Sequence, residues 1–190
     1  MTLESVVPGQ PYAESDEDLM QRLGRGDRAA LAALVERHQT HVLSLAQRFT
    51  GHRDTAEDIA QDAFVRVYRA APTYRPEARF TTWLYRLVVN LCWDRRRRAA
   101  REQRYRAGQR EQRQAETPSA ALDQRERAVR VQRAVQTLPD RQRLAVVLHR
   151  YQGLSHREIA EITGWSPGAV ESCLVRAYES LRRALADLRS

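Results

Sequence analysis

Arginine and aromatic side chains are concentrated between positions 74 and 98. The wider segment 75–113 holds twelve of the chain's 32 basic residues, all of them arginine, against four carboxylates, so its net charge of +8 equals that of the whole chain. The run 95–98 consists of four consecutive arginines. Five aromatic residues precede it in the same stretch: Tyr74, Phe80, Trp83, Tyr85 and Trp93. A positive surface that follows phosphates, with aromatic rings on which bases stack, is the combination that binds single-stranded nucleic acid.

The same composition also arises in a helix that binds no ligand. In such a helix Phe80 belongs to the hydrophobic core and the arginine run is a solvated helix end. For Phe80 we expect this core position. For Trp83 both interpretations stay open. Asn90 lies off the apolar stripe of the expected helix, three residues before Trp93, where its amide is available to hydrogen-bond a base edge.

A second candidate surface is acidic and lies on the expected helix 57–70. Its exposed face carries Glu57, Asp58, Gln61 and Asp62. Carboxylates near the start of a helix are stabilised by the helix dipole, so they need no further purpose. The functional alternative is a docking face for a basic partner protein, and the pattern of charges does not decide between the two.

The segment 155–170 has the spacing of a helix-turn-helix. Ser155 and Glu158 form a capping box, Gly164 falls at the turn, and Ser166 with Pro167 starts the second helix. The start of that helix enters the major groove of DNA in this motif. A plain helical hairpin is the alternative, and we favour DNA binding, with these candidate contacts: Ser166, Gly168, Glu171, Ser172, Val175 and Arg176.

Enzymatic or metal chemistry has little support in the sequence. His38 and His41 are one helical turn apart and have the spacing of a metal pair, but no third ligand accompanies them. Cys92 and Cys173 fall on different expected helices and form no CxxC pair, so we expect packing roles. We therefore expect no catalytic site, no metal and no cofactor.

Hydrophobic periodicity predicts an all-α fold with two small helical domains joined by a flexible linker. Ser15 is expected to cap the first helix, Gly51 to end the second and Asp54 to cap the third, and the fourth should fray after Arg98. The predicted units are a flexible tail at 1–14, domains at 15–98 and 122–190, and a linker at 99–121 that is too polar to fold by itself. The second domain contains the helix-turn-helix.

The overall charge limits the partners. An excess of +8 and a pI of about 10.3 suggest a polyanion, either nucleic acid or an anionic membrane. No apolar run approaches the ~20 residues that span a bilayer, and the first 15 residues lack the order of a signal peptide. We expect a cytoplasmic protein without membrane insertion.

Three motifs in this order resemble those of bacterial sigma factors. Positions 57–70 (EDIAQDAFVRVYRA) are similar to the helix that binds core RNA polymerase, and positions 80–90 (FTTWLYRLVVN) to the promoter-melting helix. Positions 138–143 (LPDRQR) and the helix-turn-helix resemble the C-terminal domain. Two domains and a short linker resemble the extracytoplasmic-function (ECF) group of the sigma-70 family. The resemblance covers about 16–185, with the linker unmatched.

The resemblance implies a role for each surface. Glu57, Asp58, Gln61 and Asp62 would bind core polymerase, and the start of the last helix would bind the minus-thirty-five element of promoter DNA. The loop 73–79 and Asn90 would capture an extruded base of the melted minus-ten element. The implied minus-ten contacts are Tyr74, Arg79, Trp83, Tyr85, Arg86, Asn90, Arg95, Arg96 and Arg97. An anti-sigma factor would cover these surfaces, and bond chemistry would belong to the polymerase.

Two other functions are compatible with parts of the sequence. A stand-alone helix-turn-helix regulator that binds duplex DNA as a dimer explains 155–187, but it leaves the acidic helix and the aromatic, basic helix without a purpose. An enzyme such as a nuclease needs convergent carboxylates or histidine ligands, which the sequence does not show.

Overall fold

The computed structural model describes residues 14–107 and 123–186, and in both ranges every regular element is a helix. The predicted all-α class is therefore confirmed. The first range holds α1 (Asp16–Gly24), α2 (Arg28–Thr50), α3 (Arg53–Ala70), the short 3-10 helix η1 (Ala71–Thr73) and α4 (Phe80–Ala107). The second range holds α5 (Asp123–Thr137), α6 (Asp140–Val146), the π-helical turn η2 (Val147–Tyr151), α7 (His156–Thr163) and α8 (Pro167–Ala184).

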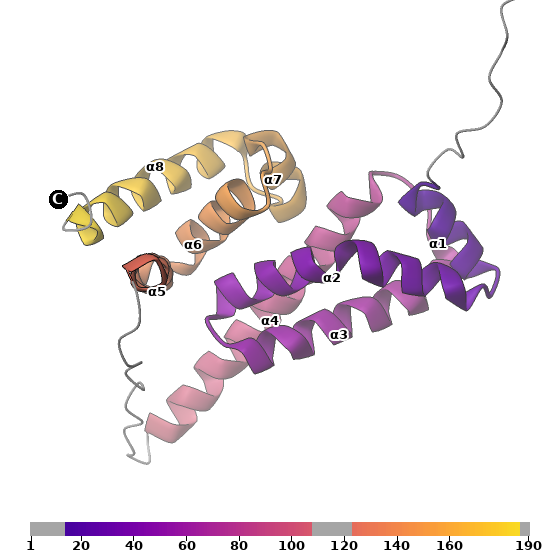
Figure 1. Cartoon of the computed structure of the whole chain (residues 1–190), viewed down its shortest axis with the longest axis horizontal. Helices are drawn as coiled ribbons and strands as arrows, with labels where there is room; N and C mark the ends of the chain where they lie inside the picture. Colours follow the sequence, from indigo (N-terminus) through magenta and orange to yellow (C-terminus); the bar gives the residue numbers. More distant parts are fainter. Residues whose placement is uncertain (1–13, 108–122, 187–190) are drawn as a thin grey trace, which may run out of the picture.

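Helices α1 to α4 form a bundle in which α2 contacts each of the other three (Figure 1). Local capping bonds set most helix ends. Ser15 and Asp18 make a capping box at α1, the side chain of Asp27 accepts from the N–H of Ala29 at α2, and Gly51 ends α2 at φ 81°. The core between the helices is apolar, and Phe80 is completely buried in it, as expected.

One predicted helix start was wrong. Helix α3 begins at Arg53 after His52, which makes no side-chain capping bond, so Asp54 lies inside the first turn and does not cap it. Helix α4 continues to Ala107, which agrees with an end somewhere after Arg98. Arginine and alanine are strong helix formers, so this stretch extends an existing helix. The rest of the predicted linker, 108–121, and the tail before residue 14 lie outside the described residues.

The helix-turn-helix has the local geometry that its sequence predicts. Ser155 and Glu158 form the capping box of α7, and Gly164 ends that helix at φ 72°. Ser166 caps α8 by accepting from the N–H of Ala169, and Pro167 follows at the first helical position. Buried side chains hold the two helices together and onto α6, among them Leu144, Ile159, Val170 and Leu174.

The two helical units pack against each other around a buried arginine. Arg143 of α6 is 4% exposed, and its guanidinium donates to three backbone carbonyls: Phe49 at 3.0 Å, Gln136 at 2.6 Å and Leu138 at 3.0 Å. Phe49 belongs to α2, so this side chain joins the end of one unit to the start of the other. The apolar core is continuous across this junction.

Gln136 and Arg48 strengthen the same junction. The side-chain amide of Gln136 donates to the carbonyl of Arg48 at 2.7 Å, and the Arg48 guanidinium lies 3.8 Å from the ring centre of Tyr151. Gly51 allows this close approach, because a Cβ there would stand 2.9 Å from the side-chain oxygen of Gln136. The junction therefore depends on residues from α2, α5, α6 and η2.

Removal of the Arg143 side chain should destabilise the whole chain. We expect Arg143→Ala to lower the free energy of unfolding by about 2–4 kcal/mol, because three buried carbonyls lose a charged donor. Arg143→Lys should recover only part of this, since one ammonium does not reproduce the planar fork. Urea unfolding followed by circular dichroism measures both. Arg157→Ala, which removes an exposed arginine paired only with Glu161, is the matched control and should change stability by less than about 0.5 kcal/mol. Equal free energies of unfolding for Arg143→Ala and the control would contradict this role of Arg143.

Candidate nucleic-acid interfaces

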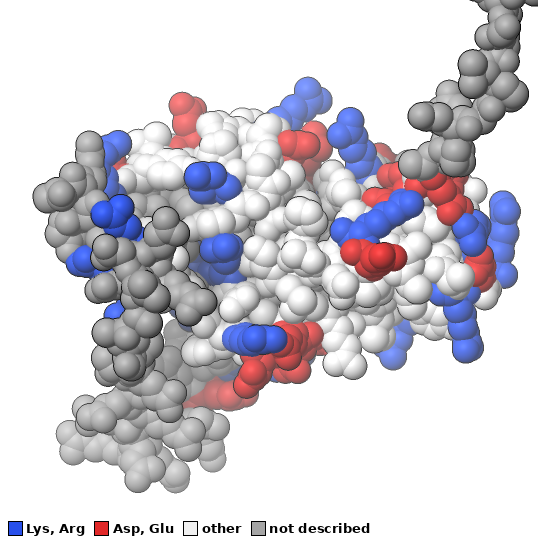
Figure 2. Space-filling view, viewed as in Figure 1, with Lys and Arg blue, Asp and Glu red and all other residues white. Residues whose placement is uncertain are grey.

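The acidic surface lies along one exposed face of α3. Glu57, Asp58, Gln61 and Asp62 are all exposed, as the sequence predicts. Two of them are already engaged: Glu57 accepts from Arg53 at 2.8 Å, and Asp58 pairs with Arg95 of α4 at 2.8 Å. On the face of the molecule drawn in Figure 2, arginines and carboxylates are interspersed, so the charge excess of the chain is not gathered there.

Two apolar residues extend this surface and were missed in the sequence. Val65 is 39% exposed and Tyr68 is 46% exposed, at positions four and seven after Gln61. Residues at these spacings share one face of a helix, which is the signal that identifies them. A mixed surface of carboxylates, an amide and large apolar side chains suits a protein partner better than a nucleic acid.

A cavity of about 330 Å³ opens between η1, the loop after it and the first turns of α4. Tyr74, Trp83 and Arg86 line it together with the hydroxyls of Thr73 and Thr82. The Tyr74 and Trp83 rings meet edge to face, with 5.4 Å between their centres. The residues that line the cavity therefore offer aromatic faces, hydroxyl groups, two guanidinium groups and one carboxylate.

The hydroxyl of Tyr74 is buried and has no hydrogen-bond partner within the described residues. A buried polar atom without a partner is costly, and because this oxygen is closed off from solvent, a ligand group reaches it only when the loop 73–79 moves. Burial raises the pKa of Tyr74, and the charges of Glu17 and Asp16 raise it further. The hydroxyl is therefore protonated at neutral pH and is a hydrogen-bond donor.

The other predicted minus-ten residues do not gather at this cavity. Asn90 and Arg79 are exposed but are not among its lining residues, so the structure does not join Asn90 to the loop. Arg97 pairs with Asp94 on its own helix, and Arg95 pairs with Asp58. Arg95, Arg96 and Arg98 instead line a separate cavity of about 370 Å³ beside the start of α3.

Three of the predicted residues contact the C-terminal unit. The Tyr85 hydroxyl donates to the side-chain oxygen of Gln152 at 3.1 Å, and Arg86 donates to the backbone carbonyl of Glu161 at 2.8 Å. Arg96 forms an ion pair with Asp140 at 2.9 Å. Helix α4 therefore contacts α6, α7 and the turn after η2 with side chains that the sequence assigned to DNA.

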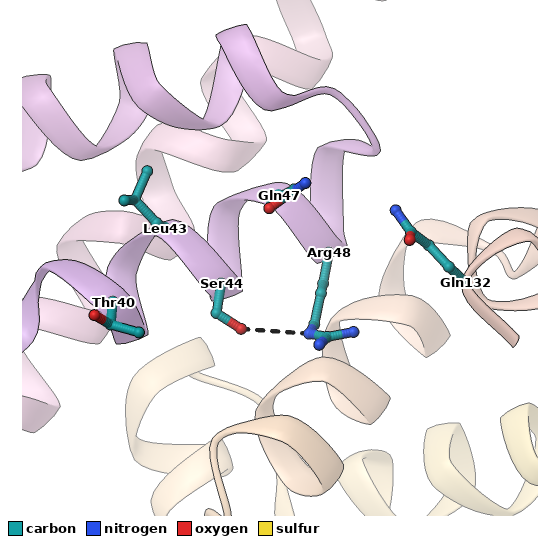
Figure 3. A pocket seen from close by; sticks show the side chains of 6 residues that line it. All are labelled: Thr40, Leu43, Ser44, Gln47, Arg48 and Gln132. Atoms are coloured by element: carbon teal, nitrogen blue, oxygen red, sulfur yellow. Dashed lines mark hydrogen bonds between the residues drawn. The ribbon is translucent and has the colours of Figure 1, made fainter. Parts of the chain in front are cut away.

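A polar cavity of about 450 Å³ lies at the junction between α2 and α5 (Figure 3). Arg48 lines it and donates to Ser44 at 3.3 Å, the bond that is dashed in the figure. Gln132 of α5 closes the other side. No predicted site residue lies here, and the single cation is already held by Ser44 and Tyr151, so we assign this cavity no role.

The candidate minus-thirty-five surface is fully accessible. All six predicted residues, Ser166, Gly168, Glu171, Ser172, Val175 and Arg176, are exposed, and Val175 is 52% exposed. Val170, Leu174 and Ala177 hold the opposite face of α8 in the core. The hydroxyl of Ser166 is used as the helix cap, and the Nε of Arg176 donates to the carbonyl of Ser172 at 3.1 Å.

The remaining chemical groups have structural partners. His38 bonds to Asp16 at 2.7 Å and His41 to Gln152 at 3.3 Å, so the two histidines do not converge on one site. Cys92 and Cys173 are buried, and burial raises the pKa of Cys92 to about 12. Within residues 14–107 and 123–186, no cluster of three or more metal-ligating side chains occurs. In the same ranges no helix combines the length and the apolar character that a membrane span requires.

Comparison with known proteins identifies both units. Residues 34–102 match the family model of sigma-70 region 2, and residues 128–181 match that of sigma-70 region 4. The RNA polymerase sigma-H factor of Pseudomonas aeruginosa is 34% identical over 92% of this chain and 96% of its own. The ECF RNA polymerase sigma factor SigM of Mycobacterium tuberculosis is 35% identical over 96% and 90%.

Solved structures agree with these matches. The structure of CnrH in complex with the cytosolic domain of CnrY superposes with a TM-score of 0.68 at 29% identity, covering 92% of this chain and 99% of that one. The sigma factor RpoE of Bartonella quintana, in complex with the anti-sigma factor NepR, gives a TM-score of 0.67 at 22% identity, covering 82% and 96%. This second likeness concerns the fold alone. With relatives above 30% identity along almost its whole length, the chain belongs to the extracytoplasmic-function group of the sigma-70 family of RNA polymerase sigma factors.

Proposed function

We propose that this ECF sigma factor uses three separate surfaces to start transcription. The exposed face of α3 binds core RNA polymerase, the cavity at Tyr74 accepts an unstacked base of the minus-ten element, and the start of α8 binds the minus-thirty-five element. The observation that carries the proposal is the cavity that Tyr74 and Trp83, whose rings are in contact, line together with Arg86. The protein itself performs no bond chemistry and acts in the cytoplasm.

The α3 surface supports polymerase docking through charge and apolar contact together. Asp62 forms no ion pair within the described part of the chain and lies one turn from the exposed Val65. A basic partner helix would pair with the carboxylates, while Val65 and Tyr68 would bury apolar area at the centre of the contact. Complementary charge of this kind speeds association and excludes partners of like charge.

The cavity supports base capture by stacking and hydrogen bonding. Extrusion of a base from duplex DNA costs a few kcal/mol of stacking and pairing. One aromatic stack recovers about 1–3 kcal/mol, and a hydrogen bond from Tyr74 adds about 1 kcal/mol. Trp83 and Tyr74 therefore supply enough binding energy to offset most of the cost for a single base.

Arg86 links this cavity to the C-terminal unit. Its guanidinium lines the cavity, yet it donates to the carbonyl of Glu161. Its Nη2 donates to that carbonyl, so Nε and Nη1 are left to bind a phosphate or base. A melted strand bound by Arg86 would therefore lie beside the contact between α4 and the unit formed by α5 to α8.

The stand-alone regulator is the less favoured alternative. It requires only α7 and α8, whereas the relatives match this chain over both units and carry the names of RNA polymerase sigma factors. We further propose that an anti-sigma factor holds this protein inactive, as the complex of RpoE with NepR suggests for that relative of the fold.

Reversal of one charge on α3 should weaken binding to core polymerase. We expect Asp62→Arg to lower the affinity at least about tenfold, because a like charge would face the basic partner. Fluorescence anisotropy of labelled protein titrated with core enzyme measures it. Glu36→Arg makes the same charge change on an exposed position of α2 and should leave the affinity within about twofold. Unchanged affinity for Asp62→Arg would remove α3 from the polymerase contact.

Removal of the Tyr74 hydroxyl should reduce binding of the melted strand without reducing stability. The ligand is a single-stranded DNA decamer that the wild-type complex with core polymerase selects from a random pool. We expect Tyr74→Phe, also bound to core polymerase, to lower the affinity for this decamer about fivefold to tenfold. Thermal unfolding should not decrease, because the lost hydroxyl had no partner in the folded protein. Tyr178→Phe, which changes a half-buried tyrosine of α8 outside the cavity and outside the proposed DNA-binding positions, is the matched control. Equal decamer affinity in Tyr74→Phe and wild type would argue against base capture at this hydroxyl.

Arg176 should contribute directly to duplex binding. If it forms a bidentate contact with guanine, Arg176→Ala costs about 1–3 kcal/mol and relaxes sequence preference at one position. A phosphate contact would instead lower affinity for all sequences and reduce the salt dependence by about one counterion. Selection of duplex sequences by the holoenzyme at two salt concentrations separates the two. Arg183→Ala, further along α8, is the control, and no effect of Arg176→Ala on either measure would exclude this residue from the contact.

A further inference from the structure

The first turn of α4 is capped by a residue from a distant helix. The N–H of Phe80 donates to the Glu17 carboxylate of α1 at 2.7 Å, although the two residues are 63 positions apart. The N–H groups at the start of a helix have no partner within it, and a carboxylate there is stabilised by the helix dipole. Glu17 therefore acts as a charged cap for the helix that carries Trp83 and Arg86.

Glu17 differs from the other acidic residues near α1. Glu14 and Asp27 pair with Arg22, Asp16 contacts Arg37 and His38, and Asp18 belongs to the capping box at Ser15. Within residues 14–107 and 123–186, Glu17 forms no ion pair and lies half-buried. Its carboxylate is thus committed to the backbone of Phe80 instead of to a neighbouring cation.

Helix α1 holds the other end of the same loop through Gly24. A Cβ at Gly24 would stand 2.6 Å from the backbone oxygen of Ala71, so the glycine lets α1 lie directly against η1. Figure 1 shows α1 at the end of the bundle where the chain turns from α3 into α4. The segment between Ala71 and Phe80, which includes Tyr74, is therefore anchored to α1 at both ends.

We propose that Glu17 is a positioning residue for recognition of the melted minus-ten strand. It fixes the start of α4 relative to the loop, and this fixes the distance between Tyr74 and Trp83 across the cavity. Glu17 itself contacts no DNA. The inference rests on the proposed capture of a base at this cavity, and it adds a residue of α1 whose loss would disturb the site from outside.

The nearness of Glu17 to the cavity is consistent with its effect on Tyr74. Burial is the main cause of the raised pKa of the Tyr74 hydroxyl, and the charge of Glu17 adds to it. Replacement of Glu17 by a neutral residue should therefore lower the pKa of Tyr74. The carboxylate thus acts on the cavity in two ways, by geometry and by charge.

The test compares Glu17→Ala with Asp18→Ala in the full chain bound to core polymerase. Asp18→Ala removes a capping carboxylate from the same helix without touching the loop. We expect Glu17→Ala to lower the affinity for the selected single-stranded decamer about fivefold, because the loss of one helix cap costs about this much free energy. The affinity for core polymerase should stay unchanged. Asp18→Ala should leave both affinities unchanged. Glu17→Gln, whose amide oxygen still accepts from Phe80, should recover most of the decamer affinity.

A second variant protects the test against misfolding of Glu17→Ala. Gly24→Ala should push η1 away from α1, because its Cβ would clash with the backbone of Ala71. It should also lower the affinity for the decamer and leave the affinity for core polymerase unchanged. Equal decamer affinities for wild type, Glu17→Ala and Gly24→Ala would overturn the positioning role and leave base capture intact. Equal losses in Glu17→Ala and Asp18→Ala would also overturn it, because the effect would then be general destabilisation. A wild-type complex that selects no decamer above core polymerase alone would instead refute the proposed function, and this inference with it.

Discussion

The packing of the two helical units depends on the buried guanidinium of Arg143. A charged group in a protein interior needs hydrogen-bond partners, and here Nη1 and Nη2 donate to three carbonyls from α2 and from the segment before α6, while Nε has no partner within the described residues. Because Phe49 lies on α2, the bond to its carbonyl forms only when the two units are in contact. Gln136 and Arg48 add to the same junction, and the apolar core continues through it.

In this packing, two faces of α4 make different contacts. One of its faces, with Trp83, borders the open cavity at Tyr74, and another, with Tyr85 and Arg86, contacts the turn after η2 and α7. The surfaces on α3 and α8 remain exposed in the same arrangement. The surfaces proposed for polymerase docking and duplex binding are therefore accessible, whereas the surface proposed for strand binding shares side chains with the contact between the units.

Much of the candidate site followed from residue type and spacing. The six positions on α8 and the four on α3 are exposed as predicted, because helical periodicity separates a buried stripe from an outer face. The minus-ten set was less coherent than its sequence suggested. Tyr74, Trp83 and Arg86 share a cavity, but Asn90 does not line it and Arg95 to Arg97 pair with carboxylates. A linear pattern identifies residues that suit nucleic acid without showing which of them meet.

The sequence by itself determined the helical class, the order of the helices, the turn of the helix-turn-helix and the family. These features depend on periodicity and on bonds between residues a few positions apart, such as Ser155 with Glu158. Only the tertiary structure decided the partners of Glu17, Arg143 and Tyr85, the extent of α4 beyond Arg98 and the cavity with its unsatisfied hydroxyl. Hydrogen bonds between residues 60 or more positions apart leave no periodic trace in a single sequence, because any of many arginines or carboxylates would satisfy the same composition.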